Sequence, residues 1–191
     1  MNSPSASAFE DVVLETPRLQ LRTVRADDVL AVFAIYANAE VARYLGEPMW
    51  TDPSRAEAWV QRVMRQRLEG QALQLLLQRR EDAAVLGTCV LFHFHVASRR
   101  AEIGYVLARE HWGQGYAHEA LTALIGHGFN AIDLRRIEAD IDPRNVASAR
   151  VLQRLGFVRE GRLRERWEVA GEISDTEYWG LLRREWCSKP I

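Results

Sequence analysis

The chain has 191 residues, of which 48% are hydrophobic and 27% are charged, and its formal net charge is -1. This composition suits a globular domain with a substantial core, and the absence of an overall basic field argues against nucleic-acid binding. No apolar run reaches the roughly 18 residues of a membrane span, and the N-terminus lacks the pattern of a secretory signal. Two cysteines, Cys89 and Cys187, form neither a disulfide framework nor a metal-ligand pair. We therefore expect a cytoplasmic protein with no membrane or nucleic-acid partner.

The predicted elements form one domain over residues 14–186, between a flexible Ser- and Ala-rich lead-in (1–13) and a short tail (187–191). Alternating apolar and polar residues predict strands, and apolar residues at helical spacing predict helices. In chain order we expect a strand at 19–23, helices at 29–36, 40–44 and 53–68, strands at 73–78, 85–96 and 101–107, a helix over 117–129, a strand at 137–141, a helix at 146–155, and strands at 157–160, 163–169 and 173–182. This order predicts a mixed α/β domain with an antiparallel middle and one helix crossover.

The segment REHWGQGYAHEA, residues 109–120, places two glycines between a strand and a helix. Gly113 and Gly115 allow a close approach of the backbone, and the first amides of the helix have no partner within it. Such a helix start is an anion site that suits phosphate. A tight turn with no ligand is the alternative. The P-loop pattern is missing, and a dinucleotide fingerprint would need a third glycine where His118 stands. Asp140 lies near the position where such a fingerprint has its ribose-binding acid, so a dinucleotide-binding oxidoreductase fits in part.

Several longer motifs, in order, carry a resemblance to a known family. AEIGYVLAREHWGQGYAHEAL and NVASARVLQRLGF resemble the Gcn5-related N-acetyltransferases. LETPRLQLRTVRADDV, VARYLGEP and VAGEISDTEYWGLLRREW are similar to the branch of ribosomal-protein N-terminal acetyltransferases, so that the resemblance spans about 14–186. It implies a mostly antiparallel sheet flanked by helices, with strands that splay at a cofactor cleft. Dimers are common in this family, so a homodimer is one assembly that the resemblance allows.

The resemblance implies acetyl-CoA as the cofactor. Its pyrophosphate would lie on the loop, and its pantetheine arm would run beside the strand that holds Gly104, pairing with it like a further strand. In the family's loop motif Gly115 and Ala117 match the last two fixed positions, whereas Trp112 replaces Gln or Arg. The cofactor-binding residues implied are Tyr105, Val106, Gly113, Gln114, Gly115, Tyr116, Ala117, His118 and Asn145.

Direct transfer of an acetyl group to an amine needs a base, a donor for the oxyanion and a donor for the leaving thiolate. Glu102, on the strand beside the thioester, is the candidate base, with an ion pair to a nearby arginine as its alternative role. A backbone amide near Tyr105 or Val106 would hold the oxyanion. The family's usual tyrosine acid is replaced by Leu152, and the motif N-x-x-S offers Ser148 instead, while Asn145 would also cap its helix.

The remaining candidates concern the acceptor and other chemistries. Tyr44 and Trp50 are expected to line the acceptor pocket, whereas Trp59 is expected to pack between helices. His93 and His95 lack a third metal ligand, Cys89 is expected to be a buried thiol, and Asp175 matches a family position without a clear role. We expect an acetyl-CoA-dependent N-acetyltransferase acting on a primary amine, namely a protein N-terminus. A small-molecule amine as acceptor and a non-catalytic acyl-CoA-binding domain remain open.

Overall fold

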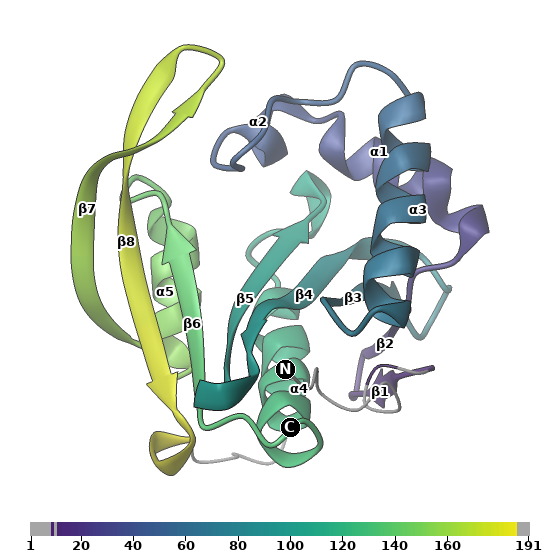
Figure 1. Cartoon of the computed structure of the whole chain (residues 1–191). Coiled ribbons are helices and arrows are strands. Elements are labelled where there is room, and N and C mark those ends of the chain that lie inside the picture. The colour runs from purple at the N-terminus through teal and green to yellow at the C-terminus, as the bar shows by residue number, and fades with distance from the viewer. Residues whose placement is uncertain (1–8, 10, 187–191) are drawn as a thin grey trace.

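A computed structural model describes Phe9 and residues 11–186. Its eight-stranded sheet has the order β1-β2-β3-β4-β5-β6-β8-β7, and only the β5–β6 pair is parallel, which confirms the predicted mixed, mostly antiparallel sheet (Figure 1). The strands are β1 (Val13–Glu15), β2 (Leu19–Thr23), β3 (Leu73–Arg79), β4 (Val85–His95), β5 (Arg100–Leu107), β6 (Arg136–Ile141), β7 (Val158–Val169) and β8 (Glu172–Leu182). The α-helices are α1 (Val29–Tyr36), α2 (Ala39–Ala42), α3 (Ser54–Leu68), α4 (Tyr116–Asn130) and α5 (Val146–Arg154).

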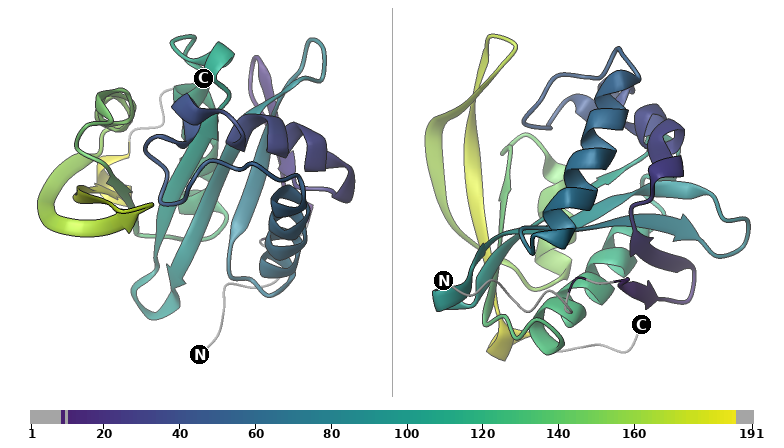
Figure 2. Two further views of the ribbon diagram at one scale, coloured as in Figure 1. Left: turned by 90° about the horizontal axis from the view of Figure 1, so that it is seen from above. Right: turned by 45° about the vertical axis from the view of Figure 1, so that its right-hand side comes forward.

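Helices cover both faces of the sheet, and each face has its own core (Figure 2). The apolar stripe of α4, with Leu121, Leu124 and Ile125 fully buried, packs on the face that carries Leu75 and Leu91. On the other face, α1 and α3 enclose a second core in which the Tyr36 and Trp50 rings stack with centroids 4.4 Å apart. The helices on the two faces hold the central strands in fixed positions. A binding site at the ends of those strands needs such a rigid support.

Local sequence signals account for most element boundaries. The Asp52 carboxylate accepts a hydrogen bond from the Ser54 amide at the start of α3, as a capping residue before proline predicts. The two-residue turn Ala170–Gly171 has positive φ at both residues, 50° and 83°, which is the type I′ geometry of tight hairpins.

The structure differs from the prediction at both ends of the sheet. Phe9 and Val12 are buried in the core and β1 begins at Val13, so the folded chain extends into the predicted lead-in. The other lead-in residues (1–8 and 10) and the predicted tail (187–191) lie outside the described residues. The two predicted strands at 157–160 and 163–169 are one strand, β7, which is interrupted by bulges and not by a turn. At one bulge the Asp175 carboxylate accepts from the Glu165 amide and from Arg162 Nε, both at 2.8 Å, which gives Asp175 a structural role.

Candidate functional site

The two parallel strands at the centre of the sheet separate along their length. β5 and β6 pair only from Arg100↔Arg136 to Glu102↔Glu138, and beyond Glu102 the two strands diverge. The Ala108 amide donates to the Leu86 carbonyl, so by antiparallel alternation the backbone groups of Tyr105 point away from β4 and into the opening. The same alternation directs the Val106 amide to β4, so of the two predicted oxyanion donors only the Tyr105 amide faces the gap. The strand therefore offers free backbone groups to an extended ligand.

The loop before α4 has the backbone that the two glycines predict. Gly113 and Gly115 have φ of 74° and 83°, and an added Cβ at Gly113 would meet no atom within 4 Å, so backbone conformation and not space requires glycine there. Glu119 N–H makes the first helical hydrogen bond, to the Gly115 carbonyl at 3.1 Å. The amides of Tyr116, Ala117 and His118 therefore lie ahead of the helical ladder and form a site for an anion.

A cluster around the buried Glu119 carboxylate, which the sequence analysis missed, holds this loop in place. Glu119 accepts hydrogen bonds from Thr16 Oγ1 at 2.6 Å, from the Arg18 amide at 2.8 Å and from Arg18 Nε at 2.6 Å. The Arg18 guanidinium also donates to the Gln114 carbonyl at 3.0 Å and lies 4.4 Å from the Tyr116 ring centroid. These contacts tie the β1–β2 turn to the loop across about a hundred positions, so no local pattern could have revealed them.

A cavity of about 350 Å³ joins the strand opening to the loop. Its wall contains five of the nine predicted cofactor-binding residues and the predicted acid Ser148: the five are Tyr105, Val106, Gly113, Ala117 and Asn145. The other four residues do not line the cavity: Tyr116 is buried in the core, and Gln114, Gly115 and His118 are exposed elsewhere on the loop and the start of α4. Trp112 also lines the cavity, and its Nε1 donates to the Leu107 carbonyl at 2.8 Å. The prediction did not include Trp112, although its presence in place of the family's Gln or Arg was the signal that could have identified it.

Within this cavity Tyr105 and Ser148 form a hydrogen-bonded pair. The Tyr105 hydroxyl donates to Ser148 Oγ at 3.0 Å, which leaves the Ser148 proton free to be donated to a ligand. Burial raises the pKa of Tyr105 above its ordinary value, against a smaller opposite effect of the Ser148 hydrogen bond, so the phenol stays neutral. Asn145 Oδ1 accepts from the Ser148 amide at 3.1 Å and so caps α5 as predicted. Leu152 is buried in the core and lines no part of the cavity.

The predicted base lies at the point where the strands part. Glu102 is the last residue of β5 paired with β6, and its side chain is 24% exposed. Its predicted alternative partner was an arginine, but its partner in the structure is His93, whose Nδ1 lies 3.2 Å from Glu102 Oε2. Glu102 does not line the cavity, although it shares the face of β5 with Gly104 and Val106.

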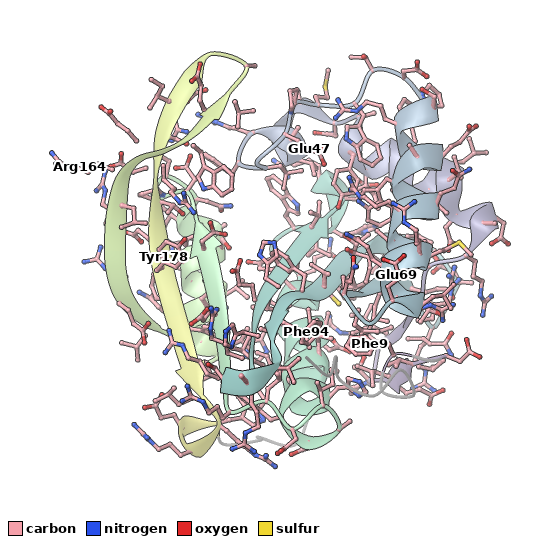
Figure 3. All side chains as sticks on the ribbon, viewed as in Figure 1. Phe9, Glu47, Glu69, Phe94, Arg164 and Tyr178 are labelled. Carbon is pink, nitrogen blue, oxygen red and sulfur yellow. The ribbon has the colours of Figure 1, made fainter. Side chains whose placement is uncertain are left out.

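A second cavity of about 250 Å³ adjoins the first and shares Tyr44, Leu45 and Arg144 with it. It lies between the segment from Ala42 to Pro48 and the β7–β8 hairpin; Figure 3 labels Glu47 on one side of this opening and Tyr178 of β8 on the other. Tyr44 lines both cavities, as expected of an acceptor-pocket residue. Trp50 lines neither, because it is buried against Tyr36 and its Nε1 donates to Glu47.

Cys89, His93 and His95 of β4 are the remaining residues that the sequence offered for other chemistry. Cys89 is fully buried, and burial raises its pKa, so the thiol is not a nucleophile. His95 Nδ1 accepts from the Ser98 amide, and no group of three His, Cys, Asp or Glu residues among those described could hold a metal ion. Within the same residues, no helix combines the length and the apolar character that crossing a bilayer would require.

A splayed pair of parallel strands, a glycine-bearing helix start and a cavity between them define an acyl-CoA-dependent transferase fold. The family model described as "Acetyltransferase (GNAT) domain" matches residues 18–158, and the chain belongs to this family of N-acetyltransferases, which use acetyl-CoA. The chain is 38% identical to an uncharacterized N-acetyltransferase, p20, of Bacillus licheniformis, over 91% of this chain and 98% of that one. It is 20% identical to a spermidine N(1)-acetyltransferase of Vibrio cholerae, over 90% and 97% of the two chains.

Two solved structures show the same fold. A Vibrio cholerae protein provisionally assigned as a ribosomal-protein-serine acetyltransferase superposes with a TM-score of 0.79 and 27% identity, covering 95% of this chain and 99% of that one. RimJ of Mycobacterium smegmatis, solved with a CoA disulfide, superposes with a TM-score of 0.82 and 25% identity, covering 93% and 90%. The N-acetyltransferase activity that the sequence predicted is thereby confirmed at the level of the family.

Proposed function

We propose that this N-acetyltransferase acetylates the α-amine of a protein N-terminus. The observation that carries the proposal is the meeting of two cavities at Tyr44, Leu45 and Arg144, one beside the predicted cofactor loop and one open between the 42–48 segment and the β7–β8 hairpin. An acceptor chain that entered through the second cavity would reach the first cavity past Tyr44, Leu45 and Arg144. Such an open approach from two distant segments suits a chain end.

The residues of the first cavity have complementary roles toward acetyl-CoA. When bound, acetyl-CoA supplies an activated acetyl group as a thioester. The free amides of 116–118 would hold its pyrophosphate, and the exposed backbone of Tyr105 would pair with its pantetheine arm. The Tyr105 amide would hold the carbonyl oxygen, and Ser148, whose oxygen already accepts from Tyr105, would donate a hydrogen bond to the departing thiolate sulfur.

The acceptor amine must lose a proton, and Glu102, which lies outside the walls of the two cavities, would take it through water. At neutral pH about one α-amine in ten is neutral, compared with about one lysine-type amine in a few thousand, since their pKa values are about 7.7–8.0 and 10.4. A partly exposed carboxylate that acts through a water molecule is adequate to deprotonate an α-amine and poorly suited to a lysine-type amine. The similarity to a structure provisionally assigned as a ribosomal-protein-serine acetyltransferase supports the same acceptor.

A small polyamine is the second candidate, because the second cavity is acidic. Its lining includes four carboxylates against two arginines: Glu47, Asp140, Asp142 and Glu172 against Arg43 and Arg144. Asp142 and Glu172 are both paired with Arg144, and Glu47 accepts from Trp50 and Arg55, whereas the Asp140 side chain makes no hydrogen bond or ion pair with another described residue. The similarity to a spermidine N(1)-acetyltransferase points the same way.

Release of CoA thiol with a panel of amines tests the proposal. The panel contains peptides with free Ser, Ala or Met N-termini, the same peptides blocked at the α-amine but carrying an internal lysine, and spermidine. We expect the free peptides to give the highest kcat/KM and mass spectrometry to find the acetyl group on the α-nitrogen. Faster turnover of spermidine, or acetylation of the internal lysine at an equal rate, would refute the α-amine assignment.

A further inference from the structure

Strand β4 contains a bulge directly beside Glu102. β4 and β5 pair regularly up to Phe92↔Glu102, and the next pair is His95↔Arg100, so two residues of β4, His93 and Phe94, oppose a single residue of β5. His93 has φ of 49°, a left-handed conformation that a residue other than glycine rarely adopts within a strand. The bulge also turns Phe94 into the core, where its ring meets Phe9 with centroids 5.1 Å apart (Figure 3).

Only one other strand residue in the described part of the chain, Glu165, combines a side chain with a positive φ. Its bulge is stabilised by Asp175, which accepts a hydrogen bond from the Glu165 amide. At His93 the structure offers a different account. The bulge directs the imidazole to the Glu102 carboxylate, with Nδ1 3.2 Å from Oε2, and the Phe92 ring lies beside the imidazole with centroids 4.4 Å apart.

We infer that His93 is a positioning residue for acetyl transfer and that it orients the Glu102 carboxylate. Because an ionised carboxylate offers only acceptors, an N–H at Nδ1 would be attracted to Oε2, 3.2 Å away, which leaves Oε1 available for the proton of the acceptor amine. Glu102 stands where β5 leaves β6, on the face shared with Gly104, so its rotamer decides whether the carboxylate reaches the opening. Bulges often re-aim side chains near active sites. The inference rests on the proposed role of Glu102 as the base.

Three substitutions separate this role from a structural one. His93→Gly suits the left-handed backbone but removes the imidazole, and His93→Asn tolerates the same backbone and retains an N–H donor near the Nδ1 position. His95→Asn is the matched control, since His95 is an exposed histidine of the same strand whose side chain hydrogen-bonds only with the Ser98 amide among the described residues. The assay measures CoA release with the amine that the wild type acetylates fastest, so it does not depend on which acceptor class is correct.

We expect His93→Gly to unfold at a temperature no lower than that of the wild type and to lower kcat about tenfold with an unchanged KM for acetyl-CoA. His93→Asn should recover most of the rate, His95→Asn should retain it, and His93→Gly should cost nothing further in a Glu102→Gln background. A stable His93→Gly enzyme at full rate, or an Asn variant no faster than the Gly variant, would overturn the inference while leaving Glu102 as the base. A Glu102→Gln enzyme at full rate would overturn the base assignment and the role of His93 with it.

Discussion

The Tyr105–Ser148 pair gives the sharpest test of the proposed chemistry, through Ser148→Ala. In the structure the serine oxygen already accepts from Tyr105, so its single proton is free for the departing sulfur. A hydrogen bond to a charged acceptor contributes about 1.5–3 kcal/mol, and each 1.36 kcal/mol corresponds to about a tenfold change in rate. We therefore expect the single-turnover rate of acetyl transfer to fall about 10- to 150-fold. The affinity for CoA should change little, because the loop amides and Asn145 are untouched.

Stability and rate should separate in a double-mutant cycle. Ser148→Ala leaves the Tyr105 hydroxyl without its acceptor, at a cost of about 1–3 kcal/mol in the free energy of unfolding, toward the lower end because Tyr105 is only half-buried. Tyr105→Phe keeps the Ser148 proton and should slow transfer much less. The double variant, in which neither partner is left unpaired, should regain stability but not rate. A Ser148→Ala enzyme within twofold of the wild-type rate would refute the assignment of Ser148 as the acid. A Tyr105→Phe enzyme slower than the Ser148→Ala enzyme would refute it as well.

Three further predictions concern the loop, the missing tyrosine and pH. Replacing Gly113 by Val should weaken CoA binding measured by calorimetry about tenfold or more, because φ of 74° costs a side chain roughly 1–2 kcal/mol; unchanged affinity would contradict the loop assignment. Leu152→Tyr should destabilise the fold by about 1–3 kcal/mol in urea unfolding and should not rescue Ser148→Ala, since Leu152 is buried in the core; rescue would show that position 152 reaches the cofactor. Burial pushes the pKa of Glu119 upward, but hydrogen bonds from Thr16 and Arg18 and the charge of Arg18 together hold it below its ordinary value. Glu119 therefore stabilises the fold above about pH 4.3, and this contribution is lost as the pH falls through the lowered pKa. The difference in unfolding free energy between wild type and Glu119→Gln should shrink in acid, and a difference independent of pH would contradict this role of Glu119.

The sequence predicted best the features that depend on neighbouring residues. A capping Asp52 before Pro53 defined the start of α3, and the spacing of apolar residues defined α4. The loop at Gly113 and Gly115 was predictable because left-handed backbone favours glycine. β1 was missed because three residues are too few to show alternation, and its place in the sheet depends on pairing with β2.

Features that depend on distant contacts could not be predicted. His93 lies in a bulge of β4 that is visible only in the register with β5, so the sequence pattern could not show that His93 contacts Glu102. Trp50 is an aromatic residue between α2 and α3, and only its stacking on Tyr36 shows that it belongs to the core and not to the pocket. Arg18 lies within the motif LETPRLQLRTVRADDV, but the motif does not show that Arg18 contacts both Gln114 and Glu119.

The difference between local and distant contacts also distinguishes the proposed cofactor side of the site from the proposed acceptor side. The cofactor side is built largely from backbone groups of one continuous stretch, from Gly104 to His118, and backbone conformation leaves a sequence signature in its glycines. The proposed acceptor side is lined by two segments more than a hundred residues apart in the sequence, 42–48 and 167–176, together with residues 140–144 at the end of β6. Substitutions in those two segments can therefore alter the acceptor without disturbing the cofactor loop. This independence explains why the family and its cofactor were recognised from sequence, whereas the acceptor must be determined by assay.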